Sequence, residues 1–199
     1  MQEFPLANIP LDPGNGGRSI LPDALNPGDL ILSTTNGFGS EAIRALTGGG
    51  PASHVRLYIG TDTTGSPAII EAVPGAGVTL SDLAGDLAGD SLAVAFRRPG
   101  ITDESARAAV DYAKEQLGVA YNYFGVIRQF LARYASAVDL VVNLGAQDNQ
   151  TAYCSQLVTN TFIQAQLPLT LTNPAFNSPD DIVQLDWFGE LEYVGHLKY

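Results

Sequence analysis

Two neighbouring segments constrain the fold most, because both have the pattern of β-strands. In residues 54–60 (HVRLYIG) every second residue from Val55 to Ile59 is apolar, which is typical of a strand with one buried face. Pro67–Val73 (PAIIEAV) is also strand-like, and the residues between the two segments favour a turn. The sequence therefore predicts an antiparallel hairpin.

The hairpin also predicts which side chains meet. If it is symmetric about its loop, position 60 faces position 67 and Arg56 faces Glu71. His54 then lies on the same sheet face as Glu71, as its diagonal neighbour, with the two backbones about 7 to 8 Å apart. A slip of one residue would place the two side chains on opposite faces.

The rest of the chain predicts one α+β domain, an antiparallel sheet packed against helices, over residues 27–199. Residues 1–26 contain four prolines and little periodicity, so we expect an extended N-terminal arm. Further strands are expected at 29–34, 91–97 and 191–198. Helices are expected at 41–46, from 102 to 117, once or twice within 121–144, after Thr151 and from Ser178 onward.

Charge and composition exclude several classes of function. The chain has 10 Lys and Arg against 21 Asp and Glu, a formal net charge of −11, so its field repels nucleic acids. No apolar run is long enough to span a membrane, and the first residues lack the pattern of an ordinary signal peptide. We expect synthesis in the cytoplasm, with any export through a specialised secretion system.

No motif in the sequence indicates a metal or another cofactor. The zinc, phosphate-loop and paired-cysteine motifs are absent. The repeat of Asp82, Asp86 and Asp90 lacks the alternating ligands of a calcium loop, so it is interpreted as a solvated face. We expect neither a metal site nor a cofactor.

Cys154 is the only cysteine in the chain, and it lies where a helix is expected to begin. With Thr151 as the N-cap, Cys154 falls in the first turn, where free backbone N–H groups and the helix dipole favour a thiolate. A thiolate attacks carbonyl carbon. The alternative is a small buried apolar residue.

Only two histidines could serve such a thiolate as a base. His54 opens a strand after a loop, whereas His196 lies near the C-terminus, where a surface histidine needs no role. A Cys–His pair needs a third group to orient the imidazole. Glu71 can supply it, because its strand is apolar on both faces and a carboxylate there needs a partner. The alternative for Glu71 is a solvated carboxylate.

Six segments in a fixed order resemble the circularly permuted branch of the papain-like NlpC-type amidases and peptidases, the YiiX-like proteins. They extend from residue 27 to about residue 195. In that branch the histidine strand precedes the cysteine helix. The segments are PGDLI from residue 27, SHVRLYIG from 53, IEA from 70, YNYFG from 121, YCSQLV from 153 and SPDDI from 178.

The resemblance implies Cys154 as nucleophile, His54 as general base and then acid, and Glu71 as the orienting residue. It implies the Cys154 backbone N–H as one oxyanion donor and leaves the second unidentified. Arg56 stands where relatives commonly have glycine, and it could contact an anionic substrate group. Ser53 and Tyr153 are further candidates for substrate binding.

The function implied is that of a cysteine hydrolase that cleaves amide bonds through a thioester, in the stem peptides of peptidoglycan. A secreted antibacterial effector with an inhibitory immunity partner would fit this substrate. Two alternatives stay open, namely a lipid ester hydrolase or acyltransferase that uses the same three residues, and a non-catalytic binding module.

Overall fold

The computed structural model describes residues 17–35, 52–122, 151–169, 177–185 and 189–197. The helix predicted at 41–46 lies outside these residues. The helices predicted within 121–144 also lie outside them, except that Tyr121 belongs to a short strand.

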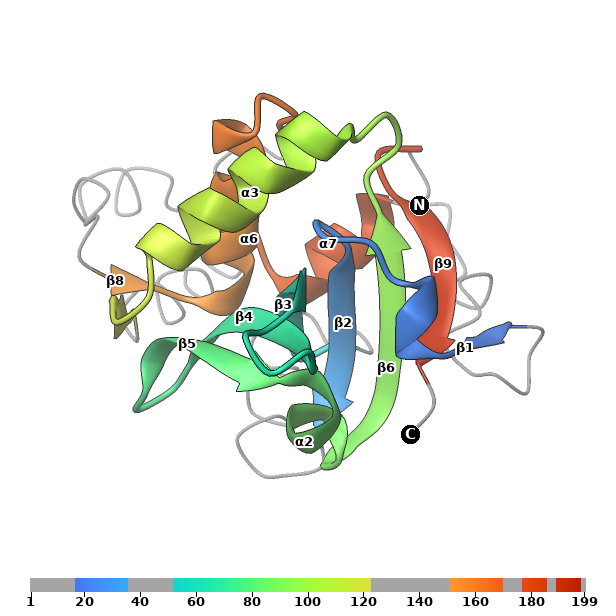
Figure 1. The fold of residues 1–199 in the computed structure, drawn as a ribbon, viewed down its shortest axis with the longest axis horizontal. Helices are drawn as coiled ribbons and strands as arrows, with labels where there is room; N and C mark the ends of the chain where they lie inside the picture. Colours follow the sequence, from blue (N-terminus) through green and yellow to red (C-terminus); the bar gives the residue numbers. More distant parts are fainter. Residues whose placement is uncertain (1–16, 36–51, 123–150, 170–176, 186–188, 198–199) are drawn as a thin grey trace, which may run out of the picture.

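A seven-stranded sheet forms the centre of the fold (Figure 1). All neighbouring pairs are antiparallel except β1 and β9, which pair in parallel at one edge. The strands expected from the sequence are confirmed to within a residue or two. In sheet order the seven strands are β1 (Ser19–Ile20), β9 (Glu192–Leu197), β6 (Asp90–Arg97), β2 (Leu30–Thr35), β3 (His54–Thr61), β4 (Pro67–Val73) and β5 (Gly77–Asp82). Of these, β1 and β5 were not expected from the sequence.

The β3–β4 hairpin has the predicted register at its inner end and a different one at its loop. Leu57 pairs with Ile70, as predicted, but Gly60 pairs with Ala68 rather than with residue 67. The loop prediction was wrong because the register shifts by one residue between Tyr58 and Gly60. The shift lies on the loop side, so the faces of the inner residues are unchanged.

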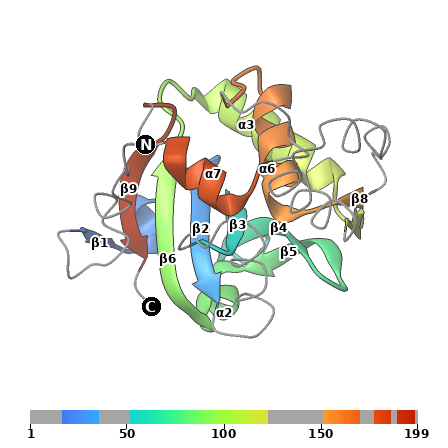
Figure 2. The same ribbon diagram turned by 180° about the vertical axis from the view of Figure 1, so that it is seen from behind.

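Helices cover both faces of the sheet. On one face α6 (Cys154–Gln164) packs on β3 and β4 and against α3 (Asp103–Glu115). Figure 2 shows α7 (Pro179–Gln184) across β2 and β6 on the same side. The opposite face carries α2 (Leu83–Leu87), which packs on β4, β5 and β6. Each face has its own apolar core, so both faces are buried over much of the sheet.

Local capping signals set two of the helix starts. Thr102 and Ser178 cap α3 and α7, each with a reciprocal side-chain bond three residues on, and Pro179 opens α7 as predicted. The predicted cap of α6 was wrong. Thr151 belongs to β8 (Thr151–Ala152), which pairs with β7 (Ala120–Tyr121), and Tyr153 is the N-cap without a side-chain bond.

The aspartate repeat is not the solvated face that the sequence suggested. Asp82 ends β5 and caps α2, where it accepts a hydrogen bond from the Gly85 N–H at 2.7 Å. Asp86 and Asp90 both bind a buried arginine. The β5–α2–β6 segment folds under the sheet and so brings Asp86 and Asp90 to the arginine. The spacing of the aspartates in the sequence does not reveal this long-range arrangement.

The two ends of the described chain meet at the β1–β9 edge (Figure 1). His196 in β9 is only 2 % exposed and its Nδ1 lies 2.6 Å from the Tyr193 hydroxyl, so the prediction of a surface histidine was wrong. Among the described helices, none has the length and apolar character that crossing a membrane requires.

Candidate active site

Cys154 is the first residue of α6, and its side chain is nearly buried, at 6 % exposure. The helix start points its free backbone N–H groups and its positive dipole end toward this position. Because α6 packs on β3 and β4, the thiol is brought to the end of β3 where His54 begins the strand. The predicted position in a first helical turn is confirmed.

His54 and Glu71 are in direct contact. The His54 Nε2 lies 2.8 Å from the Glu71 Oε2, as expected for diagonal neighbours on one sheet face. The Ser81 hydroxyl of β5 donates to the other carboxylate oxygen at 2.9 Å. Glu71 is 2 % exposed and the His54 side chain 15 %, so the pair is largely screened from water.

These contacts keep Glu71 ionised. Burial opposes the charged form of the carboxylate, but the hydrogen bond and charge of His54, with contributions from Arg56 and Ser81, lower the pKa of Glu71 to about 2. Glu71 is therefore an anion throughout the physiological range and accepts a hydrogen bond from the His54 Nε2–H.

His54 and Cys154 shift each other in opposite directions. Burial opposes the charged form of His54, yet the charge of Cys154 and the hydrogen bonds to Cys154 and Glu71 raise its pKa from 6.5 to about 9. Burial likewise opposes the thiolate, but His54 and the Val55 and Ser155 backbone groups lower the pKa of Cys154. Since Nε2 faces Glu71, Nδ1 is left for the thiol. Both shifts favour a thiolate–imidazolium pair over a neutral thiol and imidazole.

Arg56 lies under this group rather than in front of it. Its side chain is 3 % exposed, with Nε 3.4 Å from the Glu71 Oε2 and Nη1 3.0 Å from the Asp90 Oδ2. It also contacts Asp86 and the Ser33 hydroxyl. This placement argues against the direct substrate contact that the sequence suggested.

The other two candidates for substrate binding are buried as well. Ser53 is 2 % exposed, and its N–H donates to the Ser33 carbonyl at 2.9 Å. Tyr153 is 1 % exposed and packs at the start of α6. Both side chains support the segments that carry His54 and Cys154.

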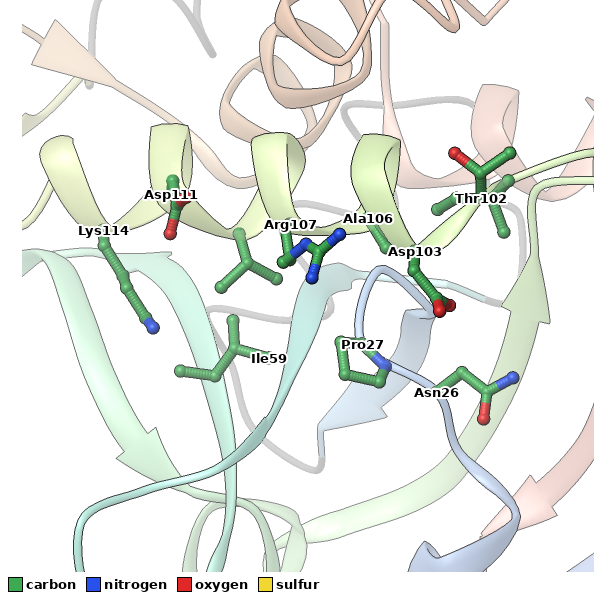
Figure 3. Close-up of a pocket in the computed structure, with 11 residues that line it drawn as sticks. Asn26, Pro27, Ile59, Thr102, Asp103, Ala106, Arg107, Asp111 and Lys114 are labelled. Carbon is green, nitrogen blue, oxygen red and sulfur yellow. The ribbon is translucent and has the colours of Figure 1, made fainter.

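A pocket of about 520 Å³ lies elsewhere, between α3 and the turn before β2 (Figure 3). It reaches β3 only at Ile59, five residues from His54, or about 16 Å along the strand. Acidic and basic side chains alternate along its helical wall at Asp103, Arg107, Asp111 and Lys114. The pocket is separate from the Cys154 site, and its wall carries no net charge.

The geometry of the site agrees with a comparison against known families. Residues 24–188 match the family described as permuted papain-like amidase enzyme, YaeF/YiiX, C92. The chain belongs to this family. The YiiX-like assignment made from the ordered motifs is thereby confirmed, and so is the permuted papain-like fold.

One curated protein and one solved structure are similar to this C92 protein. It is 28 % identical over 210 residues to the probable lipoprotein peptidase YaeF of Escherichia coli K12, covering 91 % of this chain and 74 % of that protein. The fold is similar to a crystal structure described as metalloprotein yiiX from Escherichia coli O157:H7, with a TM-score of 0.60 and 18 % identity over 84 % of this chain and 95 % of that one.

In this C92 protein the described residues contain no cluster of three or more His, Cys, Asp or Glu side chains arranged to hold a metal ion. The sequence interpretation missed two residues at the site, Asp86 and Asp90. One signal was available, because Arg56 lies on a strand with apolar flanks and a buried guanidinium needs acidic partners.

Proposed function

We propose that this protein is a cysteine amidase or peptidase in which Cys154 is the nucleophile, His54 the general base and acid, and Glu71 the residue that orients His54. The observation that carries the proposal is the 2.8 Å contact of His54 Nε2 with Glu71, made by an imidazole that lowers the pKa of the Cys154 thiol at the start of α6. Membership of an amidase family supports the same reaction class.

The acylation step follows from the charges at the site. The Cys154 thiolate attacks the carbonyl carbon of the scissile amide, and a C–S bond forms as the carbonyl oxygen becomes an oxyanion. The Cys154 backbone N–H at the start of α6 faces this oxygen and stabilises its charge. The His54 imidazolium then gives its Nδ1 proton to the leaving nitrogen, the C–N bond breaks and a thioester remains.

Deacylation uses the same residues in reverse roles. Neutral His54 takes a proton from a water molecule, which attacks the thioester carbon. The C–S bond breaks, the acid product leaves, and Cys154 returns as a thiolate beside a protonated His54. Glu71 stays ionised throughout, since its low pKa keeps it an acceptor for the far side of the ring.

For the substrate, we propose the peptide stems of peptidoglycan, by analogy with NlpC-type amidases. The chain's charge of −11 is compatible with this choice, because it disfavours the anionic surfaces of nucleic acids and acidic lipids. The relative named a probable lipoprotein peptidase supports peptide-bond cleavage in general terms.

Digestion of purified sacculi tests this function. We expect the wild-type protein to release peptide fragments that mass spectrometry identifies, and Cys154→Ala and His54→Ala to release none. His196→Gln is the matched control, because it replaces the other histidine, which lies three strands away from β3 in the sheet.

Two outcomes would contradict the proposal. Release of acyl chains from lipid vesicles without cleavage of sacculi would show that the same three residues act on lipid esters rather than on peptidoglycan. Iodoacetamide that labels wild-type Cys154 no faster than a free thiol near neutral pH would refute the activated nucleophile and favour a binding module.

A further inference from the structure

The guanidinium of Arg56 shares an oxygen with the catalytic histidine. The Glu71 Oε2 lies 2.8 Å from the His54 Nε2 and 3.4 Å from the Arg56 Nε. Glu71 is therefore held between two cations, one of which belongs to the proposed proton-transfer group. The second cation has no counterpart in the usual three-residue scheme.

Three further side chains hold Arg56 in place. Asp86 from α2 contacts Nε, while Asp90 from the start of β6 contacts Nη1 at 3.0 Å. Ser33 of β2 accepts a hydrogen bond from the same Nη1. Since these groups come from three different elements, the guanidinium is tied on several sides beneath β3.

The cluster needs a permanent cation at its centre. Three carboxylates, those of Glu71, Asp86 and Asp90, surround Arg56, and buried carboxylates at such separations repel unless a positive charge lies between them. Arginine keeps its charge at every pH of interest, and its planar fork contacts several acceptors at once. Lysine can supply the charge but not the fork.

We propose that Arg56 is a positioning residue for the Cys154–His54–Glu71 group, which fixes the Glu71 carboxylate against His54 and keeps a permanent positive charge beside this contact, with Asp86 and Asp90 as its anchors. The effect of Arg56 on catalysis rests on the proposed function, whereas its effect on the His54 pKa does not.

The sign of the effect follows from the charges that face His54. Cys154 of α6 and Glu71 of β4 favour the imidazolium, and the Arg56 charge opposes it and lowers the His54 pKa. Asp86 and Asp90 partly neutralise Arg56, while Ser33 and Ser81 carry no charge. A less basic imidazolium gives its proton more readily to a leaving amine, which is the benefit to acylation.

Histidine NMR provides a test that needs no substrate, because the chain contains only two histidines. We expect Arg56→Met to raise the His54 pKa by about one unit, as the loss of a nearby buried charge predicts. Asp90→Asn should shift it the opposite way, by about 0.3 unit or more, since Arg56 is then less neutralised. Arg56→Lys should stay closer to the wild type than Arg56→Met.

Arg97→Met is the matched control for the loss of a buried ion pair. Arg97 binds the buried Asp29 through two hydrogen bonds, of 2.8 and 2.7 Å, at the far end of β6. We expect this variant to melt at a lower temperature while its His54 pKa stays within ~0.2 unit of the wild type.

The outcomes separate this proposal from the proposed function. An unchanged His54 pKa in Arg56→Met would overturn the positioning role and leave a purely structural one. If Arg56→Met does not fold, Asp90→Asn decides, and a titration identical to the wild type would overturn the proposal. A wild-type His54 that titrates near 6.5 would instead contradict the ion pair of the proposed function, whatever the variants show.

Discussion

The substitution Glu71→Gln isolates the contribution of one buried charge to the reactivity of Cys154. Glutamine has nearly the same shape, and its amide oxygen can still accept the His54 N–H bond. What is lost is the negative charge that accepts this bond at 2.8 Å. The imidazolium then has one fewer counterion, and the thiolate–imidazolium pair is weakened.

The size of the effect can be worked from the contact. An opposite charge at this distance shifts a pKa by about 1–3 units. Taking about two units, the His54 pKa should fall from about 9 to about 7, a difference of ~3 kcal/mol between the protonation states. At pH 8 the protonated fraction of His54 would then fall from about nine-tenths to about one-tenth, so the pKa of Cys154 rises and its alkylation rate at this pH should fall roughly tenfold.

The assay is iodoacetamide alkylation followed by intact-protein mass spectrometry between pH 5 and 9, since the chain contains a single cysteine and every adduct reports on Cys154. Glu192→Gln is the control, an exposed glutamate on β9 at the far side of the sheet. If the pH profile of Glu71→Gln coincided with that of the wild type, the Glu71 carboxylate would not support the ion pair, and the reasoning would be refuted.

Three further predictions follow from the same contacts. The melting temperature should be highest at about pH 4–5. Glu71, with its pKa lowered to about 2, contributes fully above about 4.5 and loses this as pH falls toward 2. Asp86, with its pKa raised to about 6, contributes fully below 3.8 and loses this as pH rises through 6, and His54, with its pKa raised to about 9, loses its contribution as pH rises from 6.5 through 9. Ser81→Ala should cost about 1 kcal/mol of unfolding free energy and shift the alkylation profile less than Glu71→Gln. Gly77→Ala should destabilise the fold by about 1–3 kcal/mol in urea unfolding, because the backbone is at φ +79° and a methyl group would strike the Val119 carbonyl.

Much of the candidate site could be predicted because it depends on short-range patterns. Alternation in residues 54–60 places His54 and Arg56 on one face, and the paired strand brings Glu71 to the same face through a turn of five residues. A cysteine at the first position of a helix is also a local feature. The order of the motifs then indicated the family.

The errors arose where distant segments decide local structure. The bulge near Gly60 shifted the loop pairing, and β8 took Thr151 away from its expected capping role by pairing with β7. His196 is buried because β9 pairs with both β1 and β6. The pairings of β8 and β9 join residues that lie far apart in the sequence, so local patterns do not reveal them.

The sequence by itself determined five of the seven strands of the central sheet, the three candidate residues and the face that His54 shares with Glu71, because two-residue and helical periodicities are properties of the local backbone. Only the tertiary structure decided the role of Arg56. Its partners Asp86 and Asp90 lie 30 and 34 residues further along the chain, and they reach it because the β5–α2–β6 segment folds under the sheet. The effect of a buried charge depends on the groups that surround it, and the packing of the whole domain decides which groups those are.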